Sequence, residues 1–195
     1  MANPSSHPGL LIVLCGPSGV GKSTISRLLE TRLGVLYVVS ATTRPHRPGD
    51  EQAKTYDHIS RDEFFRRLDA DEFLEYAQVY GDYYGTPKQP VLKHLEVGKD
   101  VLLEIDVQGA LQVRYQYPES LMVFILPPDE PTLLKRLTDR GRDSAEDINK
   151  RFRAAKREIH MAKGSRSFDY MVINDNLDQA VDEIIKIVKH KRAGI

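Results

Sequence analysis

The chain has 195 residues, enough for one domain with a substantial buried core. Its 28 basic and 28 acidic residues balance, so no excess charge points to nucleic acid or a membrane surface as a partner. The only cysteine, Cys15, excludes an intramolecular disulfide and is expected to be a small buried hydrophobe in a cytoplasmic protein. Residues 1–9 are expected to form a flexible tail, and the apolar run after them is too short for a signal peptide or a membrane span.

Short apolar runs alternate with helical patterns along the chain. Five of these runs are typical of buried strands, at residues 10–14, 36–39, 101–105, 121–126 and 170–173. The last helix is expected over about 177–189, where apolar residues form one stripe. This alternation predicts an α/β fold, with a five-stranded parallel sheet flanked by helices.

A complete phosphate-loop motif, G-x-x-x-x-G-K-[ST], occupies residues 16–23 between the first predicted strand and a helical pattern. The glycines of the loop let successive backbone amides point at a phosphate, and the helix dipole adds to this anion site. Lys22 can reach the β- and γ-phosphates, and the hydroxyl of Ser23 can ligate Mg²⁺. A glycine-rich turn that matches by chance would lack this strand and helix, so the loop predicts a P-loop NTPase-type core that binds a nucleoside triphosphate.

Two segments interrupt the predicted core. Residues 40–98 are rich in Tyr, Thr, Pro and Gly and predict short strands and helices. One of these helices opens with a capping box at Ser60–Glu63, and another has Pro87 in its first turn and ends near Gly98.

The second interruption, residues 133–157, is dominated by cations, with nine Lys and Arg against four acids. A solvated helical face is the usual explanation of such a run and suits Lys150, Lys156 and Arg157. Arg140 and Arg142 instead lie in a predicted turn before a Ser144 helix cap. From there, arginines can close over bound phosphates.

Two carboxylates, Glu104 and Asp106, end the otherwise apolar third strand. Their spacing of two places both on one face at the carboxyl edge of the sheet. Buried carboxylates there need a compensating partner, which Mg²⁺ with its waters or a donor on the substrate would supply. Exposure at a frayed strand end is the alternative.

Several longer motifs are specific to one family. Together with the phosphate loop, the chain resembles guanylate kinases from about residue 10 to 189, in motifs at Ser40–Gly49, Phe73–Ala77, Tyr83–Pro87, Leu103–Ala110, Ile125–Pro128 and Arg140–Ser144. The resemblance implies ATP-dependent phosphorylation of GMP and dGMP with Mg²⁺, in purine nucleotide metabolism. It also implies a core (10–39, 99–132 and 163–189), an inserted GMP-binding segment (40–98) and a helical lid (133–162).

The resemblance also assigns site residues. ATP would bind the loop and its surroundings, at Gly16, Pro17, Ser18, Gly19, Val20, Gly21, Lys22, Ser23, Thr24 and Asn174. GMP would bind Ser40, Arg44, Arg47, Tyr56, Glu75, Tyr84, Thr86 and Asp106, and Mg²⁺ would lie near Ser23 and Glu104. The charge stabilisers in catalysis would be Lys22, Arg44, Arg140 and Arg151. The segment Asn174-Asp175-Asn176 is equally well interpreted as a plain turn or a helix cap.

Three other functions fit parts of the sequence. A guanylate-kinase-like interaction module without catalysis is disfavoured because the phosphate loop and the lid arginines are intact. A regulatory GTPase needs an Asn-Lys-x-Asp loop, which Asn149–Phe152 does not complete. A kinase for another phosphorylated acceptor is disfavoured by the base-reading set that includes Glu75 and Thr86. The oligomeric state stays open.

Overall fold

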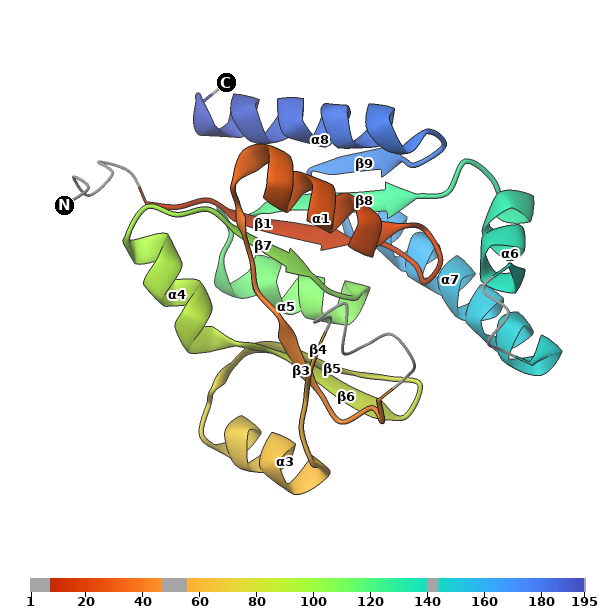
Figure 1. Ribbon diagram of the computed structural model, residues 1–195, viewed down its shortest axis with the longest axis horizontal. Helices are drawn as coiled ribbons and strands as arrows, with labels where there is room; N and C mark the ends of the chain where they lie inside the picture. Colours follow the sequence, from red (N-terminus) through yellow and green to blue (C-terminus); the bar gives the residue numbers. More distant parts are fainter. Residues whose placement is uncertain (1–7, 47–55, 140–143, 195) are drawn as a thin grey trace.

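A five-stranded parallel sheet forms the centre of the protein in a computed structural model that describes residues 8–46, 56–139 and 144–194 (Figure 1). The strand order is β2-β7-β1-β8-β9, so β1, which leads into the phosphate loop, is the middle strand. The strands are β1 (Leu11–Cys15), β2 (Leu36–Tyr37), β7 (Val101–Glu104), β8 (Leu121–Leu126) and β9 (Tyr170–Ile173). The predicted fold class is confirmed.

Both faces of this sheet are covered by helices because its strands are apolar on both sides. Along β1, Ile12 and Leu14 belong to the hydrophobic cluster under α1 (Lys22–Leu33) and α8 (Leu177–Arg192). Leu11, Val13 and Cys15 belong to the cluster on the opposite face, with α4 (Lys88–Glu96) and α5 (Val107–Gln116). Cys15 is fully buried and burial raises the pKa of its thiol, so the expected inert role holds.

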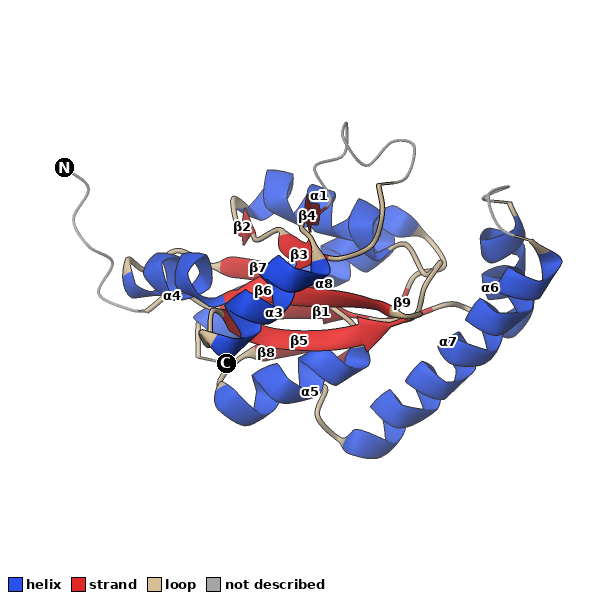
Figure 2. Ribbon diagram, turned by 90° about the horizontal axis from the view of Figure 1, so that it is seen from below, coloured by secondary structure: helices blue, strands red, loops and turns tan. Residues whose placement is uncertain are grey.

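A second, four-stranded sheet lies beside the first, in the order β4-β3-β6-β5 (Figure 2). Its elements are β3 (Ser40–Thr42), β4 (Tyr56–His58), β5 (Phe73–Val79) and β6 (Asp82–Pro87), with α3 (Arg61–Asp69) between β4 and β5. Ala41, Phe64 and Phe73 form its own small core. The expected short strands and helices are confirmed; their pairing into a separate sheet was not predicted.

The helices α6 (Glu130–Thr138) and α7 (Ala145–Ser165) pack on each other at one end of the main sheet (Figures 1 and 2). Leu133 and Leu137 of α6 are buried against Ala155 of α7. Ser144 caps α7, as predicted, because its hydroxyl accepts a hydrogen bond of 3.1 Å from the amide of Asp147. The predicted turn with Arg140 and Arg142 lies outside the described residues.

Some predicted boundaries were wrong by a few residues. The third strand ends at Glu104 rather than at residue 105, because Asp106 begins α5 as its N-cap. Pro87 is the last residue of β6 and the N-cap of α4, so it precedes the first helical turn. The last helix continues to Arg192. Within the described ranges, no helix is both long and apolar enough to cross a membrane.

Candidate active site

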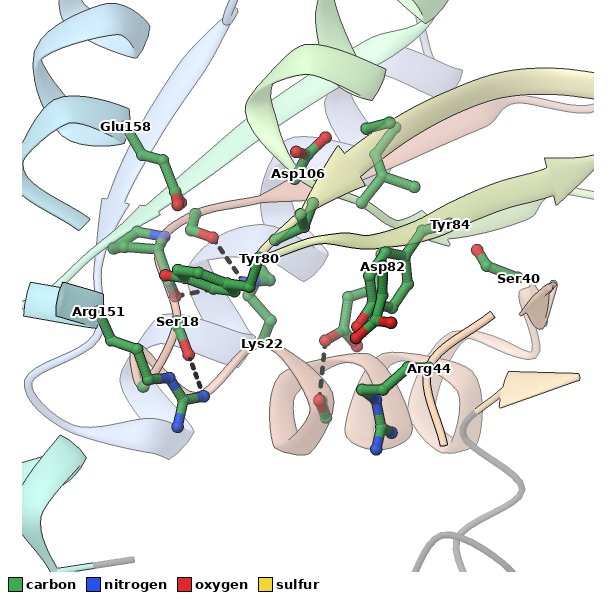
Figure 3. Close-up of a pocket in the computed structure, with 18 of the residues that line it drawn as sticks. Ser18, Lys22, Ser40, Arg44, Tyr80, Asp82, Tyr84, Asp106, Arg151 and Glu158 are labelled. Carbon is green, nitrogen blue, oxygen red and sulfur yellow. Dashed lines mark hydrogen bonds between the residues drawn. The ribbon is translucent and has the colours of Figure 1, made fainter. Parts of the chain in front are cut away.

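A cavity of about 550 Å³ opens where the phosphate loop, the second sheet and α7 meet (Figure 3). It lies at the carboxyl ends of β1 and β7, which is where open α/β sheets bind ligands. Its walls bring together the loop residues 16–19 and 21–23, Glu104 at the end of β7, Asp106 at the N-cap of α5, and Glu75 from the second sheet. Most of the predicted ATP and GMP residues therefore line one cavity, whereas Val20, Thr24, Asn174 and Thr86 do not line it.

The phosphate loop closes around the ammonium group of Lys22. Its Nζ donates hydrogen bonds to the carbonyl oxygens of Gly16, at 2.5 Å, and Pro17, at 3.2 Å. Gly21 adopts a φ of 99°, a left-handed conformation that side chains disfavour, directly before the first turn of α1. The loop thus places one positive charge and the N-terminus of α1 together at the cavity.

Asn174 is hydrogen-bonded to the backbone of the phosphate loop. It follows β9, is buried, and its Nδ2 donates a 2.8 Å hydrogen bond to the carbonyl oxygen of Val20. The cap of α8 is Asn176, whose side chain accepts from the amide of Gln179 at 3.1 Å. The interpretation of residues 174–176 as a helix cap is therefore confirmed at Asn176, and the predicted contact of Asn174 with adenine stays a prediction.

Glu104 is joined to the phosphate loop through two hydroxyl groups. Ser23 Oγ donates to Glu104 Oε1 at 2.8 Å, and Ser26 Oγ donates to Oε2 at 3.1 Å. Glu104 is half-buried, so the alternative of simple exposure at a frayed strand end is wrong. A hydroxyl and a carboxylate side by side suit Mg²⁺, which prefers oxygen ligands and keeps several of its waters.

The predicted base pocket is a buried chain of three polar side chains. Thr86 Oγ1 donates to Glu75 Oε1 at 2.5 Å, and the hydroxyls of Ser40 and Thr86 lie 3.2 Å apart. Burial raises the pKa of Glu75 to about 7, against the hydrogen bond from Thr86, and the charge of Asp106 adds to the rise. The site therefore holds a carboxyl group that takes up or releases a proton near neutral pH.

Asp106 enters the same pocket from the N-terminus of α5. Its Oδ1 accepts a 2.9 Å hydrogen bond from the amide of Gly109, and burial raises the pKa of its carboxyl group. Gly109 also faces Glu75, because a Cβ on this glycine would clash with Glu75 Oε2. Gly109 therefore binds the Asp106 carboxylate through its amide and, having no side chain, leaves room for the Glu75 carboxylate. The sequence did not reveal this role.

A cationic and aromatic group forms another wall. Arg44 is almost fully buried, with its guanidinium 5.5 Å from the centre of the Tyr56 ring. The rings of Tyr56 and Tyr84 meet edge to face, with centroids 5.5 Å apart. All three residues line the cavity, as predicted, and the predicted Arg47 lies outside the described residues.

One predicted lid arginine reaches the phosphate loop. Arg151 of α7 donates a 2.8 Å hydrogen bond from Nη2 to Ser18 Oγ (Figure 3). The helix thus brings a second positive charge to the loop that already holds Lys22. Arg140, the other predicted lid arginine, lies outside the described residues.

Among the cavity-lining residues that were missed from the sequence are Tyr80, Asp82 and Glu158. Burial raises the pKa of Glu158 to about 7, although the charge of Lys22 opposes the rise. Glu158 follows Arg151 by seven residues, or two helical turns, and this spacing could have placed both on one face of α7. Tyr80 lies in the turn of the β5–β6 hairpin and Asp82 is the first residue of β6, and no local pattern directs either toward a phosphate loop.

Comparison with known families decides between the possible P-loop proteins. The family model described as "Guanylate kinase" matches residues 9–191. This chain belongs to the guanylate kinase family. The family's reaction, ATP-dependent phosphorylation of GMP, is thereby the activity of this chain, and nothing in the comparisons supports an inactive interaction module.

Individual relatives agree with this family. A guanylate kinase of Caldanaerobacter subterraneus subsp. tengcongensis is 48% identical over 181 residues, covering 92% of this chain and 86% of the relative. A guanylate kinase of Gloeobacter violaceus is 47% identical, covering 95% of this chain and 90% of the relative.

Solved structures are similar in fold. A guanylate kinase from Anaplasma phagocytophilum matches with a TM-score of 0.77 and 28% identity, over 95% of this chain and 87% of that one. A shikimate kinase from Bacteroides thetaiotaomicron has a TM-score of 0.55 and 15% identity, over 92% of this chain and 98% of that one. At that low identity, the second match shows the shared fold alone.

Proposed function

We propose that the protein transfers the γ-phosphoryl group of ATP in line to GMP or dGMP, with both nucleotides held in the cavity. The observation that carries this proposal is that the buried Glu75 and Ser40, which are linked through Thr86, line the same cavity as the phosphate loop. One end of the cavity suits polyphosphate and the other suits a base with hydrogen-bond donors.

The base pocket favours guanine over adenine. Guanine presents two adjacent donors, N1–H and the 2-amino group, which a single carboxylate can accept together. Adenine presents an acceptor at N1, which the ionised Glu75 would repel. Ser40 and Asp106, which also line the cavity, complete the polar surroundings of the base, and Thr86 supports Glu75 through its hydrogen bond.

The acceptor phosphate would lie against the cationic and aromatic wall. The Arg44 guanidinium provides paired donors for phosphate oxygens, Arg47 adds a second cation, and the phenol groups of Tyr56 and Tyr84 add further donors. The attacking oxygen of GMP is already anionic, so the protein needs no strong general base. Its task is to align this oxygen with the γ-phosphorus.

At the donor end, the amides of the phosphate loop and Lys22 hold the β- and γ-phosphates, with Asn174 near the adenine. Mg²⁺, held through Ser23 and Glu104, would neutralise charge on the donor phosphates when bound. Lys22, Arg44, Arg140 and Arg151 stabilise the charge that spreads over the transferred group.

We further propose that residues 40–98 act as the GMP-binding segment and residues 133–162 as a lid. Closure of the lid excludes water, which limits wasteful hydrolysis of ATP. A protein with one buried thiol and this activity suits the cytoplasm and purine nucleotide metabolism.

A coupled assay of ADP release from ATP tests the function. We expect rapid release with GMP and dGMP, and little with AMP, UMP or dTMP. Preference for one of the other acceptors would overturn the assignment of guanine. Absence of ADP release with all five acceptors would contradict the proposed phosphoryl transfer.

A further inference from the structure

Glutamine side chains join the helix α5 to the edge of the second sheet, where α5 packs beside β5 (Figure 2). The strand β5 is the last in the order β4-β3-β6-β5 and pairs with β6 on one side. Gln112 Nε2 donates a 2.6 Å hydrogen bond to the carbonyl oxygen of Tyr76, and Gln112 Oε1 accepts one of 3.2 Å from the Tyr76 amide. Gln116 Nε2 donates to the carbonyl oxygen of Leu74 at 3.1 Å. The two glutamines thus bind the backbone of β5 as a further strand would.

These hydrogen bonds lie on both sides of the carboxylate that is proposed to read the base. Glu75 stands between Leu74 and Tyr76 in β5, and side chains alternate in direction along a strand. Glu75 is accordingly buried, whereas 43% of Tyr76 is exposed. The backbone on either side of Glu75 is therefore bound to α5 while the Glu75 side chain lines the cavity.

The same helix carries the other carboxylate of the base pocket. Asp106 is the N-cap of α5, and Gly109 in its first turn lies against Glu75 Oε2. Gly109, Gln112 and Gln116 follow one another at spacings of three and four, which places them on one face of the helix. Two hydrogen bonds between one side-chain amide and one residue define the position of the strand along the helix as well as its distance. This face of α5 therefore determines where Glu75 lies relative to Asp106.

We propose that Gln112 is a positioning residue for the recognition of guanine, which holds Glu75 in register with Asp106 through the backbone of Tyr76. This inference rests on the proposed function, in which the Glu75 carboxylate accepts both donors of the base. A carboxylate displaced along the strand accepts one of these donors well and the other poorly. AMP does not present this pair of donors and loses less. The effect of Gln112 therefore belongs in the choice of base rather than in the transfer step.

The test is Gln112→Met, which removes the donor and the acceptor but keeps the length and the helix propensity of the side chain. We expect the KM for GMP to rise about three- to tenfold, as for the loss of one hydrogen bond, with kcat and the KM for ATP within about twofold of wild type. The ratio of the GMP and AMP efficiencies should fall by the same factor. Gln78→Met is the matched control, because Gln78 is an exposed glutamine of β5 that donates to a backbone carbonyl in the hairpin turn, at 3.4 Å from Gly81. It should leave the ratio unchanged.

A double-mutant cycle separates this proposal from the role of Glu75 itself. Glu75→Gln should lower the ratio strongly, and Gln112→Met in that background should lower it no further. If the ratio falls in Glu75→Gln but is unchanged in Gln112→Met, or if GMP and AMP lose efficiency equally in Gln112→Met, this proposal fails while the role of Glu75 stands. Losses of the ratio that multiply would likewise show that Gln112 does not act through Glu75. If Glu75→Gln keeps the full ratio, the assignment of base recognition to Glu75 fails, and the proposal fails with it.

Discussion

The phosphate loop and the base pocket are built in opposite ways. The loop is eight consecutive residues between β1 and α1, and its lysine bonds to carbonyl groups five and six residues away. The base pocket joins Ser40, Glu75 and Thr86, which come from three strands of the second sheet, with Asp106 from the cap of α5. In the loop, the backbone conformation creates the site. In the pocket, one buried carboxylate depends on neighbours that are distant in the sequence.

Removing the positive charge of the phosphate loop should have the largest effect on turnover. Lys22→Ala should lower turnover by several orders of magnitude, because a cation is lost from a water-excluded site where charge develops. The measurement is kcat with both substrates saturating, with thermal unfolding to show that the fold is kept. Near-normal turnover in a folded variant would show that the loop does not position the transferred phosphate.

Changing the carboxylate of the base pocket should have the next largest effect. In Glu75→Gln, one acceptor becomes a donor that opposes a donor of guanine, at a cost of about 2–4 kcal/mol. At ~1.4 kcal/mol per decade, the catalytic efficiency with GMP should fall roughly 30- to 1000-fold.

AMP provides the internal control for this substitution, since it presents an acceptor at N1 and no 2-amino group. Its efficiency should fall much less or increase. The deciding quantity is the ratio of the GMP and AMP efficiencies in wild type and Glu75→Gln, with ATP saturating. An unchanged ratio would assign base recognition to Asp106, Ser40 and Thr86 instead.

A smaller effect on GMP binding is expected from a change at Gly109, which lies against the Glu75 carboxylate. Gly109→Ala would place a methyl group against Glu75 Oε2 and displace the carboxylate. We expect the KM for GMP to rise about 10- to 100-fold, as for a misplacement of about 1 Å, with the KM for ATP unchanged.

Gly164→Ala is the matched control, because Gly164 lies in α7 with no atom within 4 Å of an added Cβ. That variant should gain up to about 1 kcal/mol in helix stability without any change in GMP binding. If Gly109→Ala behaves like this control, Gly109 has no part in placing Glu75.

The difference between the contiguous phosphate loop and the dispersed base pocket explains how much could be predicted from the sequence. The five strands of the main sheet and the loop follow from contiguous patterns, and both were found. Glu75 in isolation has no local signal, and its position was implied only by the family resemblance. The contact of Gly109 with Glu75 and the support of Val20 by Asn174 join segments that are 34 and 154 residues apart. Such contacts depend on the packing of elements, which local patterns do not specify.

Burial raises the pKa of Glu75 to about 7, and its carboxyl group must be ionised to accept both donors of guanine. The protonated form, which increases as the pH falls below 7, has lost one acceptor. The catalytic efficiency with GMP should therefore rise as the pH increases through 7, and binding of GMP at pH 7 should release about half a proton from Glu75.

Calorimetric titration with GMP at pH 7, in buffers of different ionisation enthalpy, measures this release directly. The GMP phosphate has a pKa of about 6 and contributes equally to wild type and Glu75→Gln, so the difference between the two proteins isolates Glu75. We predict that wild type releases about half a proton more than Glu75→Gln. Equal proton release from both proteins would contradict the account.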